Sequence, residues 1–418
     1  MNDLHEPFLN RDADFSPYRD MAFDLSAMAR KDMAVNGDKV INATIGSFFG
    51  EDGKILTFKT VYDSFDRVPA GDKARYASDI IGNPDFREEI FNWINRKNNI
   101  SLPHTVIAAP GGTGALYLMF ANCLEKGQTL LIPDIFWGSY NLMAKKENLR
   151  LDHYTLIDEN NEVTIEGIKR KSAELMERQG KVLVLINDPC HNPTGITLGK
   201  EKWQQLISFF NELSEKGPVI VVNDVAYLDF GYDIENVTDY MSCFNDISDN
   251  VLIAIAYSCS KSFTSYGVRL GADILLSRNQ ETLNHMEAAL KRTCRSCWSN
   301  VNNGFMHCFV DVMKNHREEY IREKNEAVRL LQKRSQLIMD EARSCGLPLY
   351  PYSEGFFITI HIEDPDLLNR YHNALIANHI YTVRFRKGVR IAVCGLPLSK
   401  CRGLALRMNQ IYQEVIND

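Results

Sequence analysis

The stretch VLIAIAYSCSKSFTSYGVRLG, residues 251–271, decides the fold of this chain. Its first seven residues are apolar and rich in β-branched side chains, which predicts a short buried strand. Small hydroxyl residues, among them Ser258, surround Lys261 directly after this strand, and Arg269 follows eight residues later. A lysine at a strand end among small neutral neighbours can be desolvated, which lowers the pKa of its amine. Such an amine can form a Schiff base with an aldehyde cofactor, and an arginine at a fixed offset can hold a phosphate.

Short apolar strands alternate with helical segments on both sides of this stretch, from about residue 105 to 280. The strands are predicted at 105–110, 129–133, 182–188, 219–224, 251–258 and 272–277. This alternation predicts βαβ units and an α/β fold with a mostly parallel sheet, covered by helices on both faces. Ligands of such sheets bind beyond the carboxyl ends of the strands. Each motif described below follows one of these strands, so we expect the motifs to converge on one site.

The remaining segments are predicted to form a second, smaller domain. Residues 19–36 have the apolar spacing of a helix, and residues 282–345 are helical and highly charged, with acids and bases alternating. This alternation is typical of a long solvated helix that bridges two domains. The segment after Gly346 holds two strands and a terminal helix. We therefore expect a large cofactor-binding domain over 57–320, and a small α+β domain over 1–56 and 321–418, joined by a long interdomain helix.

The composition excludes several classes of function. The chain has 418 residues, of which 45% are hydrophobic and 24% charged, enough for two globular domains. A net charge of −7 and the lack of a Lys/Arg-rich stripe argue against nucleic-acid and membrane partners. The N-terminus is polar and carries acids, and no apolar run approaches the roughly 20 residues needed to cross a bilayer. We therefore expect a cytoplasmic protein.

The ten cysteines are expected to be reduced thiols, because no export signal is found. Cys294 and Cys297 form one CxxC pair, but no second pair stands at the spacing of a metal site. We interpret both as core or interface thiols and expect no metal.

A glycine turn follows the first of the predicted strands. Gly111-Gly112-Thr113-Gly114 opens a helix there, so that bare backbone and free N–H groups can approach an anion. The turn is neither a P-loop, because no GK[ST] follows, nor the full GxGxxG dinucleotide fingerprint.

Two further motifs follow the strands at 182–188 and 219–224. Asn192-Pro193 lies in a turn, and a cis bond there would aim the Asn192 amide inward. Asp224 ends its strand and is followed by Ala226 and Tyr227. A buried acid at a strand end is costly unless it meets a cation, and a pyridinium nitrogen would serve.

These motifs stand in a recognisable order. GGTGAL, NPTG, D-x-A-Y, S-x-S-K with an arginine eight residues later, and R-x-x-x-x-G at 390–395 follow one another along the chain. The set resembles the fold-type-I, pyridoxal-phosphate-dependent class I/II aminotransferases, closest to the aspartate/aromatic aminotransferase subgroup, over about residues 40–400. The resemblance implies the fold-type-I α/β fold, a pyridoxal 5'-phosphate cofactor and a homodimer with active sites at the subunit interface.

The resemblance also implies a role for each matching residue. Lys261 would hold the cofactor through a Schiff base and then act as general base and acid. Asp224 would pair with the pyridine nitrogen, and Tyr227 and Asn192 would hydrogen-bond the phenolic oxygen. Arg390 would grip the α-carboxylate of the substrate. The other implied positions are Gly112, Thr113, Ser258 and Arg269 at the phosphate, Tyr76 and Ser299 at the phosphate of the neighbouring subunit, Trp137 on the cofactor ring, and Gly46 beside the substrate carboxylate.

The substrate class is implied by the segment Arg295–Asn300, RSCWSN. In the subgroup that it resembles, the arginine pairs across the dimer with the side-chain carboxylate of the substrate, and an aromatic substrate displaces it. Three departures from the subgroup stand out: Tyr140 in place of a common histidine, a turn at 76–82 that is one residue longer, and Val301-Asn302 in place of two prolines. We expect an aminotransferase that acts on aspartate/glutamate-type or aromatic L-amino acids, with a 2-oxo acid such as 2-oxoglutarate as acceptor.

Two other functions stay open at this point. A β-lyase or related lyase on the same fold also needs Lys261 and Asp224, and donor turnover without a 2-oxo acid would indicate it. A ligand-sensing regulator would need a helix-turn-helix domain before the glycine turn, and the family pattern accounts for most of residues 1–110.

Overall fold

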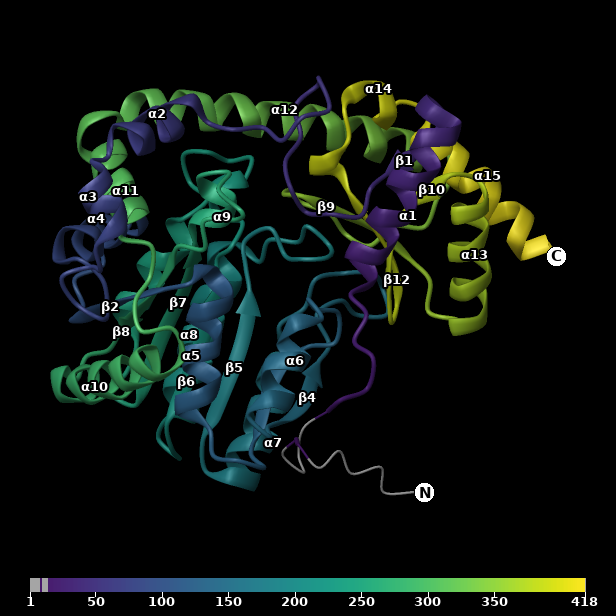
Figure 1. Cartoon of the computed structure of the whole chain (residues 1–418). Coiled ribbons are helices and arrows are strands. Elements are labelled where there is room, and N and C mark those ends of the chain that lie inside the picture. The colour runs from purple at the N-terminus through teal and green to yellow at the C-terminus, as the bar shows by residue number, and fades with distance from the viewer. Residues whose placement is uncertain (1–7, 10–13, 418) are drawn as a thin grey trace.

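The computed structural model describes residues 8–9 and 14–417 (Figure 1). Its centre is a seven-stranded sheet with the strand order β2-β8-β7-β6-β5-β3-β4. The strands are β2 His104–Ala109, β3 Thr129–Pro133, β4 Arg150–Tyr154, β5 Val182–Asn187, β6 Val219–Asp224, β7 Val251–Ser258 and β8 Gly271–Leu276. Neighbouring strands are parallel, except that β8 runs antiparallel to both β7 and β2. The predicted mostly parallel sheet is confirmed. The pattern missed β4, because this edge strand has the polar sequence RLDHY.

Both faces of this sheet are covered by helices, which explains the unbroken apolar runs. Along β5, Val182, Val184 and Ile186 pack into one hydrophobic cluster, while Leu183 and Leu185 pack into another on the opposite face. The first cluster includes side chains of α7 Glu166–Gln179 and α8 Gly199–Leu213, and the second those of α5 Gly111–Cys123, α6 Ser139–Lys146 and α10 Gln280–Cys297.

A smaller set of strands lies beside the large sheet. β9 Phe357–His361, β11 Val383–Phe385 and β12 Gly388–Ala392 form an antiparallel sheet in the order β11-β12-β9, and β1 Ile41–Asn42 pairs in parallel with β10 Ile380–Tyr381. Their helices are α1 Met21–Asn36, α13 Pro365–Ala377, α14 Leu398–Cys401 and α15 Leu404–Asn417. The N-terminal segment contacts this set of strands, because β1 pairs with β10. The domain boundaries at 57 and 320 stay a prediction.

The charged region 282–345 is three helices rather than one. α10 ends at Cys297, α11 covers Asn303–Asn315 and α12 covers Arg317–Cys345. The first break lies where Ser299 adopts a positive φ of 65° and the Asn302 side chain caps the next helix. α12 runs along the top of the molecule from α2 and α11 to α14 (Figure 1). It is not fully solvated, since one face is buried and carries Arg334 in an ion pair with Glu51 at 2.6 Å.

The other helices lie in connections between these elements. They are α2 Lys59–Arg67, α3 Ala70–Ala74, α4 Pro84–Ile94 and α9 Cys259–Ser262, with short 3-10 turns at Gly37–Lys39, Leu228–Phe230, Asp239–Asp246 and Val393–Gly395. All ten cysteines are free, with Cys294 buried and Cys297 exposed. In the part of the chain that the structure describes, no helix is long and apolar enough to cross a membrane.

Candidate functional site

A cleft of about 830 Å³ lies beyond the carboxyl ends of the parallel strands, with Asn187, Asp224 and Ser258 from the ends of β5, β6 and β7 in its lining. The expected convergence of the motifs is therefore found. Eleven of the predicted site residues line this cleft: Gly46, Gly112, Thr113, Trp137, Asn192, Asp224, Tyr227, Ser258, Lys261, Arg269 and Arg390.

Lys261 lies on α9, directly after β7. Its Nζ donates to the carbonyl oxygen of Gly46 at 2.9 Å. Burial lowers the pKa of this amine to about 8, and the nearby positive charge of Arg269 acts in the same direction. A β-carbon at Gly46 would stand 2.7 Å from the Phe357 ring, so any larger residue here would force that ring to move. Roughly one tenth of the amine is therefore neutral at pH 7, and this form is the nucleophile.

Asp224 ends β6 and is 4% exposed. The Tyr140 hydroxyl donates to its Oδ2 at 2.6 Å, and the Ala226 N–H donates to Oδ1 at 3.1 Å. Burial raises the pKa of Asp224, and these two donors oppose the shift. Tyr140 is fully buried, which raises its own pKa well above the usual range, so it stays a protonated donor. The departure from histidine at this position thus supplies a hydrogen bond to the acid, a contact that we did not predict.

Arg390 and Asn192 meet across the cleft. Asn192-Pro193 is a cis peptide, and the Asn192 N–H donates to the Asn187 side chain at 2.7 Å. Arg390 donates to Asn192 Oδ1 at 3.1 Å and to the Thr44 carbonyl oxygen at 2.7 Å. Its Nε is buried without a hydrogen-bond partner among the described residues. A buried guanidinium with a free N–H is suited to a carboxylate ligand.

A second positively charged group, the Arg269 guanidinium, lies at the N-terminus of α5. Arg269 donates to Ser260 Oγ at 2.8 Å and to the Tyr266 carbonyl oxygen at 2.9 Å. A β-carbon at Gly111 would stand 2.5 Å from the Arg269 guanidinium, so the glycine turn leaves the space that this side chain needs. The N–H groups at the start of the 13-residue α5 and the Ser258 hydroxyl complete a pocket that suits a phosphate.

Three predicted residues lie outside the cleft of their own chain. Tyr76 is 79% exposed. Arg295, in the last turn of α10, is exposed and donates to Ser299 Oγ at 2.6 Å. The roles implied for these three residues stay predictions, because each depends on a second subunit.

Two segments line the cleft that the motifs did not indicate. One is residues 18–23, which lead into α1, and the other is residues 383–386, at the tip of the β11–β12 hairpin. Of this hairpin, only Arg390 was predicted. The preceding VRFRKG is basic, and no family motif covers it.

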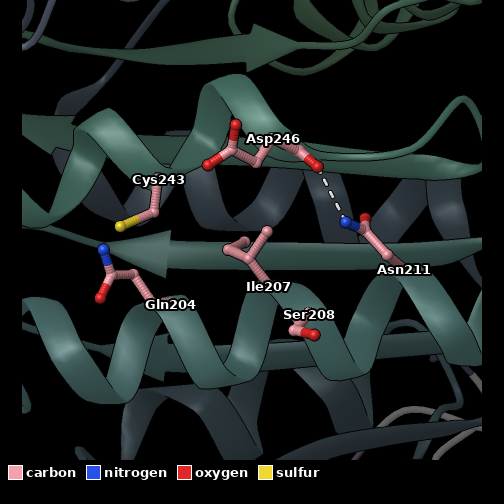
Figure 2. A pocket seen from close by; sticks show the side chains of 6 residues that line it. All are labelled: Gln204, Ile207, Ser208, Asn211, Cys243 and Asp246. Carbon is pink, nitrogen blue, oxygen red and sulfur yellow. Dashed lines mark hydrogen bonds between the residues drawn. The ribbon is translucent and has the colours of Figure 1, made fainter.

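A second hollow of about 230 Å³ lies between α8 and the 3-10 turn Asp239–Asp246 (Figure 2). Asn211 donates there to the Asp246 carbonyl oxygen at 2.8 Å. No predicted site residue lines it, and among the described residues no group of three His, Cys, Asp or Glu could hold a metal. The large cleft is therefore the candidate site.

Comparisons with known proteins agree with this choice. The family model described as Aminotransferase class I and II matches residues 38–407. The chain is 30% identical over 193 residues to an aromatic-amino-acid aminotransferase of Pseudomonas aeruginosa. This alignment covers 46% of each chain. It is also 28% identical over 268 residues to an aspartate aminotransferase of Salmonella typhi. This alignment covers 62% of this chain and 65% of that protein. The matches thus span about half to just under two thirds of these relatives.

Solved structures match over a larger share of the chain. An aminotransferase from Anaerococcus prevotii superimposes with a TM-score of 0.93 at 27% identity, over 97% of this chain and 99% of that one. An aromatic-amino-acid aminotransferase from Burkholderia pseudomallei, covalently bound to pyridoxal phosphate, superimposes with a TM-score of 0.76 over 95% of this chain and 98% of that one. At 22% identity, this second likeness concerns the fold alone.

Proposed function

The chain belongs to the class I and II aminotransferase family and has the fold-type-I architecture of its structural neighbours, and we propose that it is an amino-acid transaminase. It would move the α-amino group of an L-amino acid, of the aspartate/glutamate type or aromatic, to a 2-oxo acid such as 2-oxoglutarate. The observation that carries this proposal is the meeting of the Lys261 amine, the Asp224 carboxylate and the Arg390 guanidinium in one cleft. The names of the two sequence relatives support this range of donors.

The residues present fit a pyridoxal 5'-phosphate cofactor. The glycine turn before α5, together with Ser258 and Arg269, would hold the phosphate. Trp137 would lie against the ring, while Tyr227 and Asn192 would hydrogen-bond the phenolic oxygen. Bound pyridoxal phosphate supplies an aldehyde that takes up an amine and a ring that accepts an electron pair.

The residues of the chain would have four roles in the reaction. Arg390 binds the α-carboxylate of the substrate and so orients the α-carbon toward Lys261. Lys261, with its lowered pKa, removes a proton at that carbon and returns it later, which needs an amine that can be neutral near pH 7. Asp224, buried and hydrogen-bonded by Tyr140, would pair with the ring nitrogen of the cofactor and keep it protonated. Trp137 and Phe357 line the cleft and limit the access of water.

We further propose a homodimer in which each cleft takes residues from both subunits. Tyr76 and Ser299 would reach the phosphate of the neighbouring cleft, and Arg295 its substrate. Support comes from their positions: all three lie outside their own cleft, and Tyr76 and Arg295 are exposed. The boundaries at 57 and 320 belong to the same proposal.

The test is the absorption spectrum of the purified protein with pyridoxal phosphate. A visible band should form, shift to that of the pyridoxamine form on addition of L-aspartate alone, and return on addition of 2-oxoglutarate. A band that responds only to tyrosine or phenylalanine would keep the transaminase and identify aromatic donors. Continued consumption of the donor without a 2-oxo acid would indicate the lyase instead. The absence of any band would contradict the proposal.

A further inference from the structure

The β11–β12 hairpin brings a second arginine to the cleft that holds Arg390. β11 and β12 pair antiparallel, with Val383 opposite Arg390 and Phe385 opposite Gly388, so that Arg386 and Lys387 form a two-residue turn. Arg386 lines the cleft, as Arg390 does. At about 3.3 Å per residue, the turn lies roughly 10 Å from Arg390 along the hairpin. Two extended arginine side chains can span that separation with a short dicarboxylate between them.

The tip of this hairpin is anchored to the large sheet. Lys387 Nζ pairs with Asp134 Oδ2 at 2.7 Å, and Asp134, which directly follows β3, also accepts the Leu156 N–H at 3.3 Å. On the other side, the Tyr350 hydroxyl donates to the Lys387 carbonyl oxygen at 3.2 Å. The backbone beside Arg386 is therefore held in place at the rim, although the Arg386 side chain is exposed.

Most other charged side chains of the cleft have hydrogen-bond or ion-pair partners within the chain, whereas Arg386 remains available to a ligand. Arg269 and Arg390 bond cleft residues and are assigned above to the phosphate and the α-carboxylate, and Arg384 donates to the Asn369 side chain on α13. The acids of the lining are also engaged: Asp20 caps α1, Asp134 pairs with Lys387, and Asp224 accepts from Tyr140. In the described part of the chain, no acid or other hydrogen-bond partner engages Arg386 or Arg19.

We propose that Arg386 is a specificity-determining residue that binds the distal anionic group of the substrate, from the same chain whose Arg390 binds the α-carboxylate. The inference rests on the proposed function. Arg386 is favoured over Arg19 because it shares a short hairpin with Arg390 and lies beside an anchored residue, whereas Arg19 precedes the cap of α1. Loss of one charge-assisted pair of this kind weakens recognition by about tenfold or more.

The experiment compares glutamate with glutamine, which have the same length and differ in the distal charge. In R386M, the ratio of kcat/KM for glutamate to that for glutamine should fall by about tenfold. R384M is the matched control, because this arginine of the same hairpin is bonded to Asn369, and its ratio should match that of wild type. Calorimetric titration with glutarate gives a readout without turnover, and binding should weaken in R386M relative to R384M.

Two outcomes would overturn the inference: an unchanged ratio in R386M, or a wild type that uses glutamine as readily as glutamate. If no donor is turned over with any 2-oxo acid, the proposed function itself fails. The glutarate titration then decides the role of Arg386 separately, since equal binding by R386M and R384M would overturn it and weaker binding by R386M would support it.

Discussion

The floor and the rim of the cleft differ in how their polar groups are satisfied. On the floor, Lys261, Asp224 and Arg390 each have a hydrogen-bond partner from the same chain. On the rim, Arg19 and Arg386 are exposed, and no described residue engages them. Most buried polar groups are hydrogen-bonded within the fold, whereas exposed ones can remain available to a ligand or a second chain. We infer that the floor sets the chemistry and the rim selects the substrate.

The largest expected effect comes from removing the amine of the floor. Lys261→Ala should abolish transamination, because no other group of the floor can take its place as nucleophile and base. In wild type, uptake of pyridoxal phosphate by the apoprotein should speed up as the pH rises and level off above about 8, since the neutral amine reacts. Turnover and circular dichroism of the variant check the prediction, and normal turnover by a folded variant would contradict it.

Removal of Asp224, the acid on the floor of the cleft, should have the second-largest effect. Asp224→Ala should lower the rate by roughly 100-fold or more, because the cofactor ring nitrogen that we assign to this carboxylate would lose its partner. Stopped-flow measurement of the half-reaction with aspartate separates this loss from weaker substrate binding. A variant that keeps the wild-type rate would show that Asp224 is structural.

The floor is also the part of the site that could be predicted from the sequence. Apolar runs identify the parallel strands, and residues at or just after the carboxyl ends of these strands, such as Asp224 and Lys261, must share one edge of the sheet. The rim could not be predicted in this way. Arg386 lies in a hairpin turn whose place is fixed by the ion pair of its neighbour Lys387 with Asp134, a contact between segments distant in sequence. The edge strand β4 was missed because its polar residues break the apolar pattern.

Arg295, which lies outside the cleft of its own chain, tests whether a second subunit also helps to select the substrate. Arg295→Ala should lower kcat/KM for aspartate and glutamate by about tenfold or more while affecting tyrosine far less, because the pair with a side-chain carboxylate is lost. Steady-state kinetics with the three donors give the answer. Equal losses for all three would remove Arg295 from the substrate pocket and leave the rim to residues of the same chain.

Removing the hydrogen bond from Tyr140 to Asp224 should lower the activity less than removing Asp224 itself. Tyr140→Phe removes the hydroxyl that donates to Asp224 at 2.6 Å, so the pKa of Asp224 should rise further and the rate should fall by about tenfold. The loss should be greater at lower pH, where more of the acid becomes protonated. Tyr117→Phe is the matched control, because its hydroxyl donates to Glu147 at 2.6 Å, outside the cleft. Equal pH profiles for the two variants would contradict this role.

Asp273 gives the smallest expected effect and the sharpest contrast with Asp224. This acid of β8 is fully buried, and neither carboxyl oxygen has a hydrogen-bond partner among the described residues. Burial raises its pKa well above the usual range, so the folded protein keeps the proton. Above the ordinary carboxyl pKa of about 4, the unfolded chain releases that proton while the folded chain does not. The contribution of Asp273 to stability is therefore lost progressively as the pH rises toward its folded pKa.

Asp273→Asn removes this titration while keeping the size of the side chain. The melting temperature of the variant should exceed that of wild type by roughly 2 °C or more at pH 8, and the difference should shrink toward pH 5. The exposed Asp249→Asn serves as control and should follow wild type at both values. A difference that does not change with pH would mean that Asp273 titrates normally in the folded protein. Its carboxylate would then have to be solvated or paired, as the acid on the floor of the cleft is.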